Sequence, residues 1–364
     1  MWAVARLDEH VRVTMRDVAK RSGVSIQTVS AVLNGKPGIG VVTATQVRTA
    51  ISDLGYQPNL LASSLRSRRS TTIGLLLPNV ANPFFAEQAR GVEDVAQARG
   101  YSVMLCNTDD DPAKEQTYLR LLRQYQAAGV IGGKSASSGS PPHLSPSTMD
   151  DQRGGYVATA HLLDLGHRRI GCISGPLPGG PGEERLLGYH AALAEWGVQA
   201  DDQLLVEGAF DFASGQRGAA VLLARGVRPT AIFAHNDPMA IGAMATLKNA
   251  GLRVPEDVAV MGYDGTEIAL LYDPPLTTVI QPTYALGARA MAMLADLIEN
   301  VVGTADQPPL DCQLIVRRSM VAGLPEERRC APNATPTPWL DWRRDAPPVT
   351  SASPSSDQLI RPAW

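Results

Sequence analysis

The stretch from Thr14 to Leu65 constrains the fold most, because its turn-forming residues stand at fixed distances around short apolar repeats. Thr14 lies three residues before Asp17, which is the spacing of a capping box that begins a helix. Gly23 predicts the end of this helix, and Ser25 is a favourable N-cap for a second one. Two short helices joined by a glycine-containing turn indicate a helix-turn-helix.

The second helix of this pair is predicted to carry the residues that contact DNA. In a helix-turn-helix, side chains near the N-terminus of the second helix meet base edges in the major groove. These positions are Ser25, Ile26, Gln27, Thr28 and Ser30. A third helix is expected at about 44–54, with Gly55 as its cap. Two small apolar helices can also be ordinary core, so this pattern by itself leaves a purely structural interpretation open.

The same stretch resembles the DNA-binding headpiece of the lactose-repressor (LacI/GalR) family of bacterial transcription regulators. The matching segments are Asp17-Val18-Ala19, Ser22-Gly23-Val24-Ser25, Thr28-Val29-Ser30, Leu33-Asn34-Gly35 and Leu54-Gly55-Tyr56-Gln57-Pro58-Asn59. The resemblance implies that Thr14, Asn34 and Asn59 also contact DNA. It further implies a hinge helix in which Ala62 and Leu65 enter the minor groove, where Leu65 opens a base step. For Leu65 the alternative is a small helix packed on the body.

Charge is distributed unevenly along the chain. Residues 1–70 contain ten Lys and Arg against four Asp and Glu, whereas the remainder contains 23 against 32. A basic end on an acidic body favours phosphate binding at that end. Charged runs are often only solvated surface, but here the basic segment coincides with the helix-turn-helix. We therefore expect a homodimer on a palindromic double-stranded DNA operator, since half-sites are read by two-fold symmetry.

From residue 71 the chain alternates strands and helices. Strands are expected at 73–77, 101–106, 129–131, 169–174, 230–234, 257–261 and 312–316. Helices are expected at 82–99, 112–126, 153–165, 183–196, 214–224, 237–250 and 283–300. Repeated strand–helix–strand units argue for parallel sheets with helices on both faces. The expected fold class is α/β: an all-α helix-turn-helix headpiece followed by a two-lobed body of doubly wound parallel sheets.

In doubly wound sheets, ligands bind beyond the carboxyl ends of the strands. The predicted effector-binding residues near such ends are Asn82, Phe84, Phe85, Arg185, Phe210, Asn236, Asp237 and Asp264. The aromatic rings could stack on a flat ligand, and Arg185, Asn236 and Asp264 could bond to hydroxyls or ring nitrogens. Asn236 and Asp264 could instead cap helices, and Phe85 could be core. Arg185 is the strongest candidate, because an arginine at a helix start opposes the dipole unless an anionic or polar group faces it.

The body also resembles the periplasmic-binding-protein-like body of the same family. The resemblance rests on Asn82-Pro83-Phe84-Phe85, Leu165-Gly166-His167, Arg185-Leu186-Leu187-Gly188-Tyr189, Asn236-Asp237 and Gly262-Tyr263-Asp264. It implies a small-molecule effector, commonly a sugar or a purine. The expected organisation is a disordered extension at 1–13, the headpiece at 14–58, the hinge at 59–70, the body at 71–324 and a disordered tail at 325–364. Within the body, the N-lobe is expected at about 71–160 and 283–310, and the C-lobe at about 161–282 and 311–324.

Other chemistry has little support in the sequence. Gly132-Gly133-Lys134-Ser135 is similar to the end of a phosphate loop, but Ala128 stands where the first glycine is required. His161 and His167 are six residues apart, whereas a helical zinc pair needs four. We therefore expect no enzyme activity, no catalytic or metal site and no cofactor. Scattered cysteines, the lack of a long apolar run and the lack of an N-terminal apolar leader favour a cytoplasmic protein without membrane spans.

The family pattern is broken at residues 134–152, where the chain is about twenty residues short and rich in serine and proline. This segment is predicted to be a disordered loop that leaves the strand at 129–133 as a sheet edge, with weak or absent effector binding. Ala31 also replaces a family arginine. The leading interpretation is an effector-controlled repressor. The alternatives are a small-molecule binding protein with the same body and no role on DNA, or a decayed regulator.

Overall fold

The computed structural model describes residues 13–33, 35–56, 70–132, 150–301 and 309–320. The chain forms two compact units, Met1–Thr71 and Thr72–Trp364. Several predictions lie outside the described residues, so the structure does not bear on them. They are the extension at 1–12, Asn34, the hinge positions Asn59, Ala62 and Leu65, residues 133–149 of the shortened segment, and the tail at 325–364.

The headpiece consists of α1 (Met15–Ser22), α2 (Ile26–Leu33) and α3 (Val41–Leu54) around a small apolar core. The predicted capping box is present, because the Thr14 main-chain N–H donates to Asp17 Oδ2 at 2.8 Å. Gly23 ends α1 in the left-handed conformation, with φ of 69°. Ser25 caps α2, since its Oγ accepts a hydrogen bond from the Thr28 N–H at 3.1 Å. The helix-turn-helix prediction is therefore confirmed.

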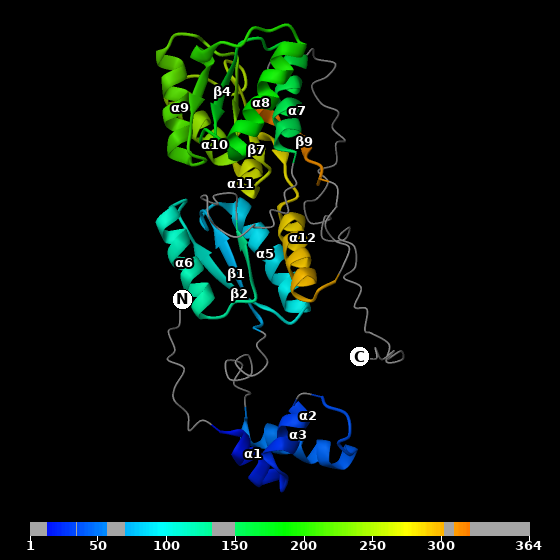
Figure 1. Ribbon diagram of the computed structural model, residues 1–364. Coiled ribbons are helices and arrows are strands. Elements are labelled where there is room, and N and C mark those ends of the chain that lie inside the picture. The colour runs from blue at the N-terminus through cyan, green and yellow to red at the C-terminus, as the bar shows by residue number, and fades with distance from the viewer. Residues whose placement is uncertain (1–12, 34, 57–69, 133–149, 302–308, 321–364) are drawn as a thin grey trace. The chain divides into compact units, whose positions relative to one another are not determined.

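The first sheet of the body has three parallel strands in the order β2-β1-β3. They are β1 (Thr72–Leu77), β2 (Ser102–Asn107) and β3 (Gly129–Gly132). Helices α5 (Pro83–Ala98) and α12 (Thr283–Ile298) pack on one face, and α6 (Pro112–Gln124) packs on the other (Figure 1). Among the described strands β3 lies at a sheet edge, as predicted from the shortened segment that follows it.

The second sheet has six strands in the order β5-β4-β6-β7-β8-β9, parallel except for the antiparallel pair β8 and β9. They are β4 (Ile170–Ser174), β5 (Leu205–Glu207), β6 (Ala231–Ala234), β7 (Ala259–Asp264), β8 (Thr277–Ile280) and β9 (Gln313–Ile315). Helices α7 (Asp151–Asp164) and α8 (Gly180–Glu195) cover one face, while α9 (Phe212–Ala224) and α10 (Asp237–Asn249) cover the other (Figure 1). Short helices η1 (Asp202–Leu204), α11 (Glu267–Leu271) and η2 (Arg318–Met320) complete this lobe.

Strand β8 was not among the predicted strands, and it begins with two threonines. Both are fully buried, and both hydroxyls are satisfied inside the lobe. Thr277 Oγ1 donates to the Arg317 carbonyl at 3.1 Å, and Thr278 Oγ1 donates to Asp237 Oδ1 at 2.6 Å. Buried polar groups are tolerated when they are hydrogen-bonded, so polarity alone does not exclude a buried strand.

Helix α7 belongs to the second lobe and corrects the predicted lobe boundary at about residue 160. It packs along α8 and contacts β6, β8 and β9. The two helices cross closely because glycines face backbone at the crossing: a Cβ at Gly155 would overlap Arg185, and one at Gly188 would overlap Gln152. The second lobe therefore begins by Asp151. Residues 151 and 152, predicted as loop, are the first turn of α7.

None of the described helices combines the length and the apolarity needed to cross a membrane.

Candidate functional site

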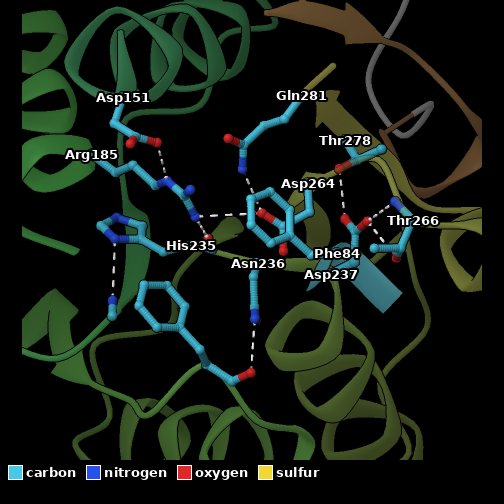
Figure 2. Close-up of polar contacts among 12 residues, drawn as sticks. Phe84, Asp151, Arg185, His235, Asn236, Asp237, Asp264, Thr266, Thr278 and Gln281 are labelled. Atoms are coloured by element: carbon cyan, nitrogen blue, oxygen red, sulfur yellow. Dashed lines mark hydrogen bonds and ion pairs between the residues drawn. The ribbon is translucent and has the colours of Figure 1, made fainter. Parts of the chain in front are cut away.

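Arg185 in α8 lies at the centre of a buried polar cluster in the second lobe (Figure 2). Its Nε donates a hydrogen bond to Asp151 Oδ1 at 2.9 Å, and its Nη1 donates to the main-chain carbonyl of His235. Nη1 also lies 3.6 Å from Asp264 Oδ1. The guanidinium carbon stands 3.8 Å from the centre of the Tyr263 ring, which is cation–π geometry.

The predicted place of Arg185 at a helix start is wrong, because α8 begins three residues earlier than expected, at Gly180. Arg185 is its sixth residue, beyond the first turn where the dipole acts most strongly. Burial disfavours the charged guanidinium, but Asp151, Tyr263 and Asp264 outweigh this effect and hold the pKa of Arg185 above its usual value. The arginine is therefore a buried cation held by acidic neighbours.

Asp264 is the last residue of β7 and has a φ of 105°, a conformation that side chains rarely adopt. Gln281 Nε2 donates to Asp264 Oδ1 at 2.7 Å and so orients the carboxyl group. Burial raises the pKa of Asp264 to about 8, although Arg185 acts in the opposite direction. Near neutral pH the side chain is mainly the uncharged acid, which can both donate and accept hydrogen bonds. The alternative role as a helix cap does not hold, since Thr266 occupies the N-cap of α11.

His235 lies fully buried in the same cluster and is neutral. Burial, and then the charge of Arg185, lower the pKa of His235 well below its usual value. Its Nδ1 accepts a hydrogen bond from the Gly175 N–H at 3.2 Å, so the ring proton is assigned to Nε2, which lies 3.3 Å from Cys172 Sγ. The ring is thus fixed on both sides, and this fixes the carbonyl that Arg185 contacts.

Asn236 and Asp237 begin α10 and have different surroundings. Asn236 Oδ1 caps α10 by accepting from the Met239 N–H at 2.9 Å, and its Nδ2 donates to the Phe210 carbonyl at 2.8 Å. The capping alternative for Asn236 is therefore confirmed. Asp237 accepts three hydrogen bonds from the N–H and hydroxyl of Thr266 and the hydroxyl of Thr278. Burial raises the pKa of Asp237 to about 6, while these donors lower it. Contact of either side chain with an effector stays a prediction.

Of the four remaining predicted residues, Phe210 lies in the second-lobe cluster, and the other three lie at the start of α5 in the first lobe. Phe210 has its ring centre 5.7 Å from the Arg185 guanidinium carbon, so it joins the second-lobe cluster. Asn82 caps α5, because its Oδ1 accepts from the Phe84 N–H at 3.0 Å. Phe84 and Phe85 meet edge to face with ring centres 5.0 Å apart. Phe85 packs against the core of the first sheet, as the alternative interpretation held.

Among the predicted DNA-contact residues that the structure describes, Ser25, Ile26 and Gln27 at the start of α2 are exposed. Val29 is completely buried, whereas Ile26 is 41% exposed and Gln27 is also exposed. The hydroxyl oxygens of Ser25 and Thr28 form a hydrogen bond with each other at 2.9 Å. α2 therefore buries one face and presents its N-terminal side chains outward, which is the arrangement a recognition helix requires.

Sequence reasoning missed Asp151, Tyr263, His235 and Gln281 as members of the cluster. For Asp151 a local signal existed: Asp150 and Asp151 form an N-cap and an acidic first turn, and Asp150 Oδ1 accepts from the Arg153 N–H at 2.8 Å. The other three carry no local signal, because they reach Arg185 and Asp264 only through the fold. Among the described residues, no group of three or more His, Cys, Asp or Glu side chains could hold a metal ion.

Three segments of the chain match described protein families. Residues 14–59 match the bacterial regulatory proteins of the lacI family. Residues 70–145 match the periplasmic binding proteins and sugar binding domain of the LacI family, and residues 159–320 match the periplasmic binding protein-like domain. A helix-turn-helix headpiece joined to such a body defines a DNA-binding transcription regulator with a small-molecule site.

Full-length relatives agree with this class. The transcriptional repressor PurR of Photobacterium profundum is 35% identical, over 84% of this chain and 98% of its own length. The ribose operon repressor of Escherichia coli is 38% identical, over 77% of this chain and 92% of its own length. The crystal structure of the lac repressor dimer bound to operator and the anti-inducer ONPF has a TM-score of 0.75 at 29% identity, covering 85% of this chain and 99% of that one. The chain belongs to the LacI family of bacterial transcription regulators.

Proposed function

We propose that this protein is a repressor in which α2 reads a two-fold symmetric operator and a small metabolite, a sugar or a related molecule, binds at the Arg185 cluster. The observation that carries the proposal is the pairing, in one chain, of an outward-facing recognition helix with a polar cluster at the carboxyl ends of β4, β6 and β7. The relatives named above are repressors of transcription. The lac repressor dimer is bound to operator DNA and an anti-inducer in its crystal structure. We further propose that the protein works in the cytoplasm as a homodimer and has no enzyme activity.

The DNA-reading half rests on the geometry of α2. Ser25, Ile26, Gln27, Thr28 and Ser30 lie in its N-cap and first turns, where side chains reach base edges. One such helix covers only a half-site, so two copies on a palindrome supply the second half. Thr14 belongs to the capping box of α1, in which its Oγ1 donates a hydrogen bond to Asp17 Oδ2 at 2.7 Å, and its contact with DNA is part of the proposal.

The effector half rests on the mixture of groups around Arg185. A guanidinium, a mainly uncharged carboxylic acid on Asp264 and the amide of Asn236 offer both donors and acceptors. The rings of Phe84 and Phe210 offer flat apolar faces. Hydroxyl groups and ring nitrogens match these groups, and a saturated apolar ligand does not.

The experiment measures binding of the full chain to duplexes from its own promoter region by fluorescence anisotropy, with scrambled duplexes as controls. We expect preference for a palindrome and a steep loss of affinity with salt, because phosphate neutralisation releases counterions. A panel of sugars and purines then tests the effector. Asp264→Ala should remove any ligand effect and leave ligand-free DNA binding nearly intact, because the headpiece is a separate unit. Equal affinity for palindromic and scrambled duplexes would refute the DNA-binding half.

A second candidate is a regulator that binds its operator without an effector. It is favoured by the three-stranded first sheet, in which β3 has no outer neighbour among the described strands. Under this candidate the palindrome is bound as above, but no ligand of the panel changes the affinity. The same measurements therefore separate the two.

A further inference from the structure

Two acidic side chains face the single guanidinium of Arg185, but they are not equivalent. Asp151 accepts a hydrogen bond from Nε at 2.9 Å, whereas Asp264 Oδ1 stands 3.6 Å from Nη1, beyond hydrogen-bond distance. Asp264 Oδ1 already accepts from Gln281. Asp151 and the arginine are both buried, so little water screens their charges. Asp151 is therefore the direct counter-ion of Arg185.

The position of Asp151 is built into the fold. It is the first residue of α7, where the helix N-terminus stabilises negative charge. Asp150 caps that N-terminus and so fixes the first turn. The close crossing of α7 and α8 at Gly155 and Gly188 then brings this turn against Arg185. A side chain at either glycine would separate the two helices.

The ion pair of Asp151 and Arg185 affects which ligands can bind to Arg185. Nη2 forms no hydrogen bond to another residue that the structure describes, so both of its N–H groups are left to donate to a ligand. A phosphate or carboxylate at Nη2 would also meet the buried negative charge of Asp151, and like charges brought together in a buried site are strongly unfavourable. A hydroxyl group accepts from the same donor without that repulsion.

We propose that Asp151 is a specificity-determining residue of the effector site: as the internal counter-ion of Arg185, it makes the site select uncharged, hydroxyl-bearing ligands and exclude phosphate and carboxylate groups. This inference rests on the proposed function, since it assumes that the Arg185 cluster is the ligand site. It assigns to Asp151 a role in choosing the ligand class as well as in holding α7 on α8.

The test replaces Asp151 by asparagine, which keeps an oxygen acceptor for Nε and removes the charge. Full-length wild type, Asp151→Asn and the double variant Asp151→Asn/Arg185→Gln are titrated with inorganic phosphate at constant ionic strength, with thermal shift as the readout. We expect Asp151→Asn to bind phosphate at least about tenfold more tightly than wild type. The double variant should lose this gain. Phosphate bound by the basic headpiece contributes equally to all three proteins and cancels.

Two results would overturn the inference. One is a folded Asp151→Asn variant, checked by circular dichroism, with no Arg185-dependent gain in phosphate affinity. The other does not depend on Asp151→Asn: wild type that binds phosphate, with the binding lost in a folded Arg185→Gln variant, would show that Asp151 does not exclude anions. If Asp151→Asn gains phosphate affinity but no sugar or purine alters DNA binding, the proposed effector control fails and the charge selection stands. If a neutral effector acts and the phosphate gain is absent, only the present inference fails.

Discussion

The guanidinium carbon of Arg185 lies 3.8 Å from the centre of the Tyr263 ring, yet the hydroxyl of the same ring is buried without a hydrogen-bond partner among the described residues. The ring therefore contributes through its face, while its polar end is unsatisfied. Helix α7 passes directly over the hydroxyl, and a Cβ at Gly154 would overlap it. A buried donor without a partner costs free energy, so this position is open to a stabilising change.

Tyr263→Phe should raise the free energy of unfolding by about 1 kcal/mol, because it removes an unpaired buried hydroxyl and keeps the ring beneath Arg185. Tyr189→Phe is the matched control. The Tyr189 hydroxyl donates to the Ile170 carbonyl at 2.8 Å, so its removal should cost about 1 kcal/mol. Urea unfolding of both variants measures the difference. Equal destabilisation by both changes would mean that the Tyr263 hydroxyl is satisfied in solution.

Gly188→Ala should destabilise the second lobe by about 1–3 kcal/mol, because the new methyl group would overlap the Gln152 carbonyl where α7 crosses α8. Gly132→Ala in β3 is the control, since a Cβ there would have its nearest neighbour at 3.8 Å, an ordinary contact. The control should be neutral or slightly stabilising. Thermal unfolding of the two variants compares them, and a neutral Gly188→Ala would contradict the close crossing.

The contribution of Asp264 and Asp237 to stability should fall as pH rises from about 4 to about 8, whereas that of His235, whose pKa is lowered in the folded chain, should rise toward pH 6.5. Burial raises the pKa of Asp264 to about 8 and that of Asp237 to about 6, so the folded chain holds protons that the unfolded chain has lost. Each group lowers the free energy of unfolding by about 1.4 kcal/mol per pH unit where it is protonated in the folded chain and ionised in the unfolded chain. Both contribute between about pH 4 and 6, and Asp264 alone contributes between about 6 and 8.

Asp264→Asn should therefore flatten the decline between about pH 6 and 8, measured as the free energy of unfolding in urea. Asp257→Asn is the control, because its hydrogen bonds from Arg253 lower the pKa of Asp257 to about 2. Its contribution has the opposite sign: it is present above about pH 4 and lost on acidification. A slope between pH 6 and 8 that Asp264→Asn leaves unchanged would show that Asp264 is ionised in the folded lobe.

Gln27→Ala should relax base preference at one half-site position by about 1–3 kcal/mol and leave other positions unchanged, because Gln27 is exposed near the start of α2. Ala31→Arg, one turn further along the same helix, should tighten binding to all duplexes, since an added cation meets phosphate without reading sequence. Anisotropy with a set of singly substituted half-sites distinguishes the two effects. Uniform weakening by Gln27→Ala would identify a phosphate contact instead.

The headpiece could be predicted from sequence because its signals are local. The Thr14–Asp17 capping box, the left-handed Gly23 and the Ser25 cap each join residues within one helical turn, and the structure contains all three. The alternation of strands and helices in the body is local in the same sense. Strand β8 was nevertheless absent from the predicted strands, and only the tertiary structure shows which distant groups satisfy the hydroxyls of its two buried threonines.

The Arg185 cluster was decided by tertiary structure. Residues 151 and 185 are 34 positions apart, and they meet only because two glycine-lined helices cross closely enough. Arg185 and Asp264 could be predicted from the sequence. The reason given for Arg185 was the helix dipole, which acts weakly at the sixth residue of α8. The sequence could not show that Asp151 already compensates the arginine or that burial keeps Asp264 protonated. Caps and periodicity depend on neighbouring residues, whereas a buried charge depends on everything that the fold places around it.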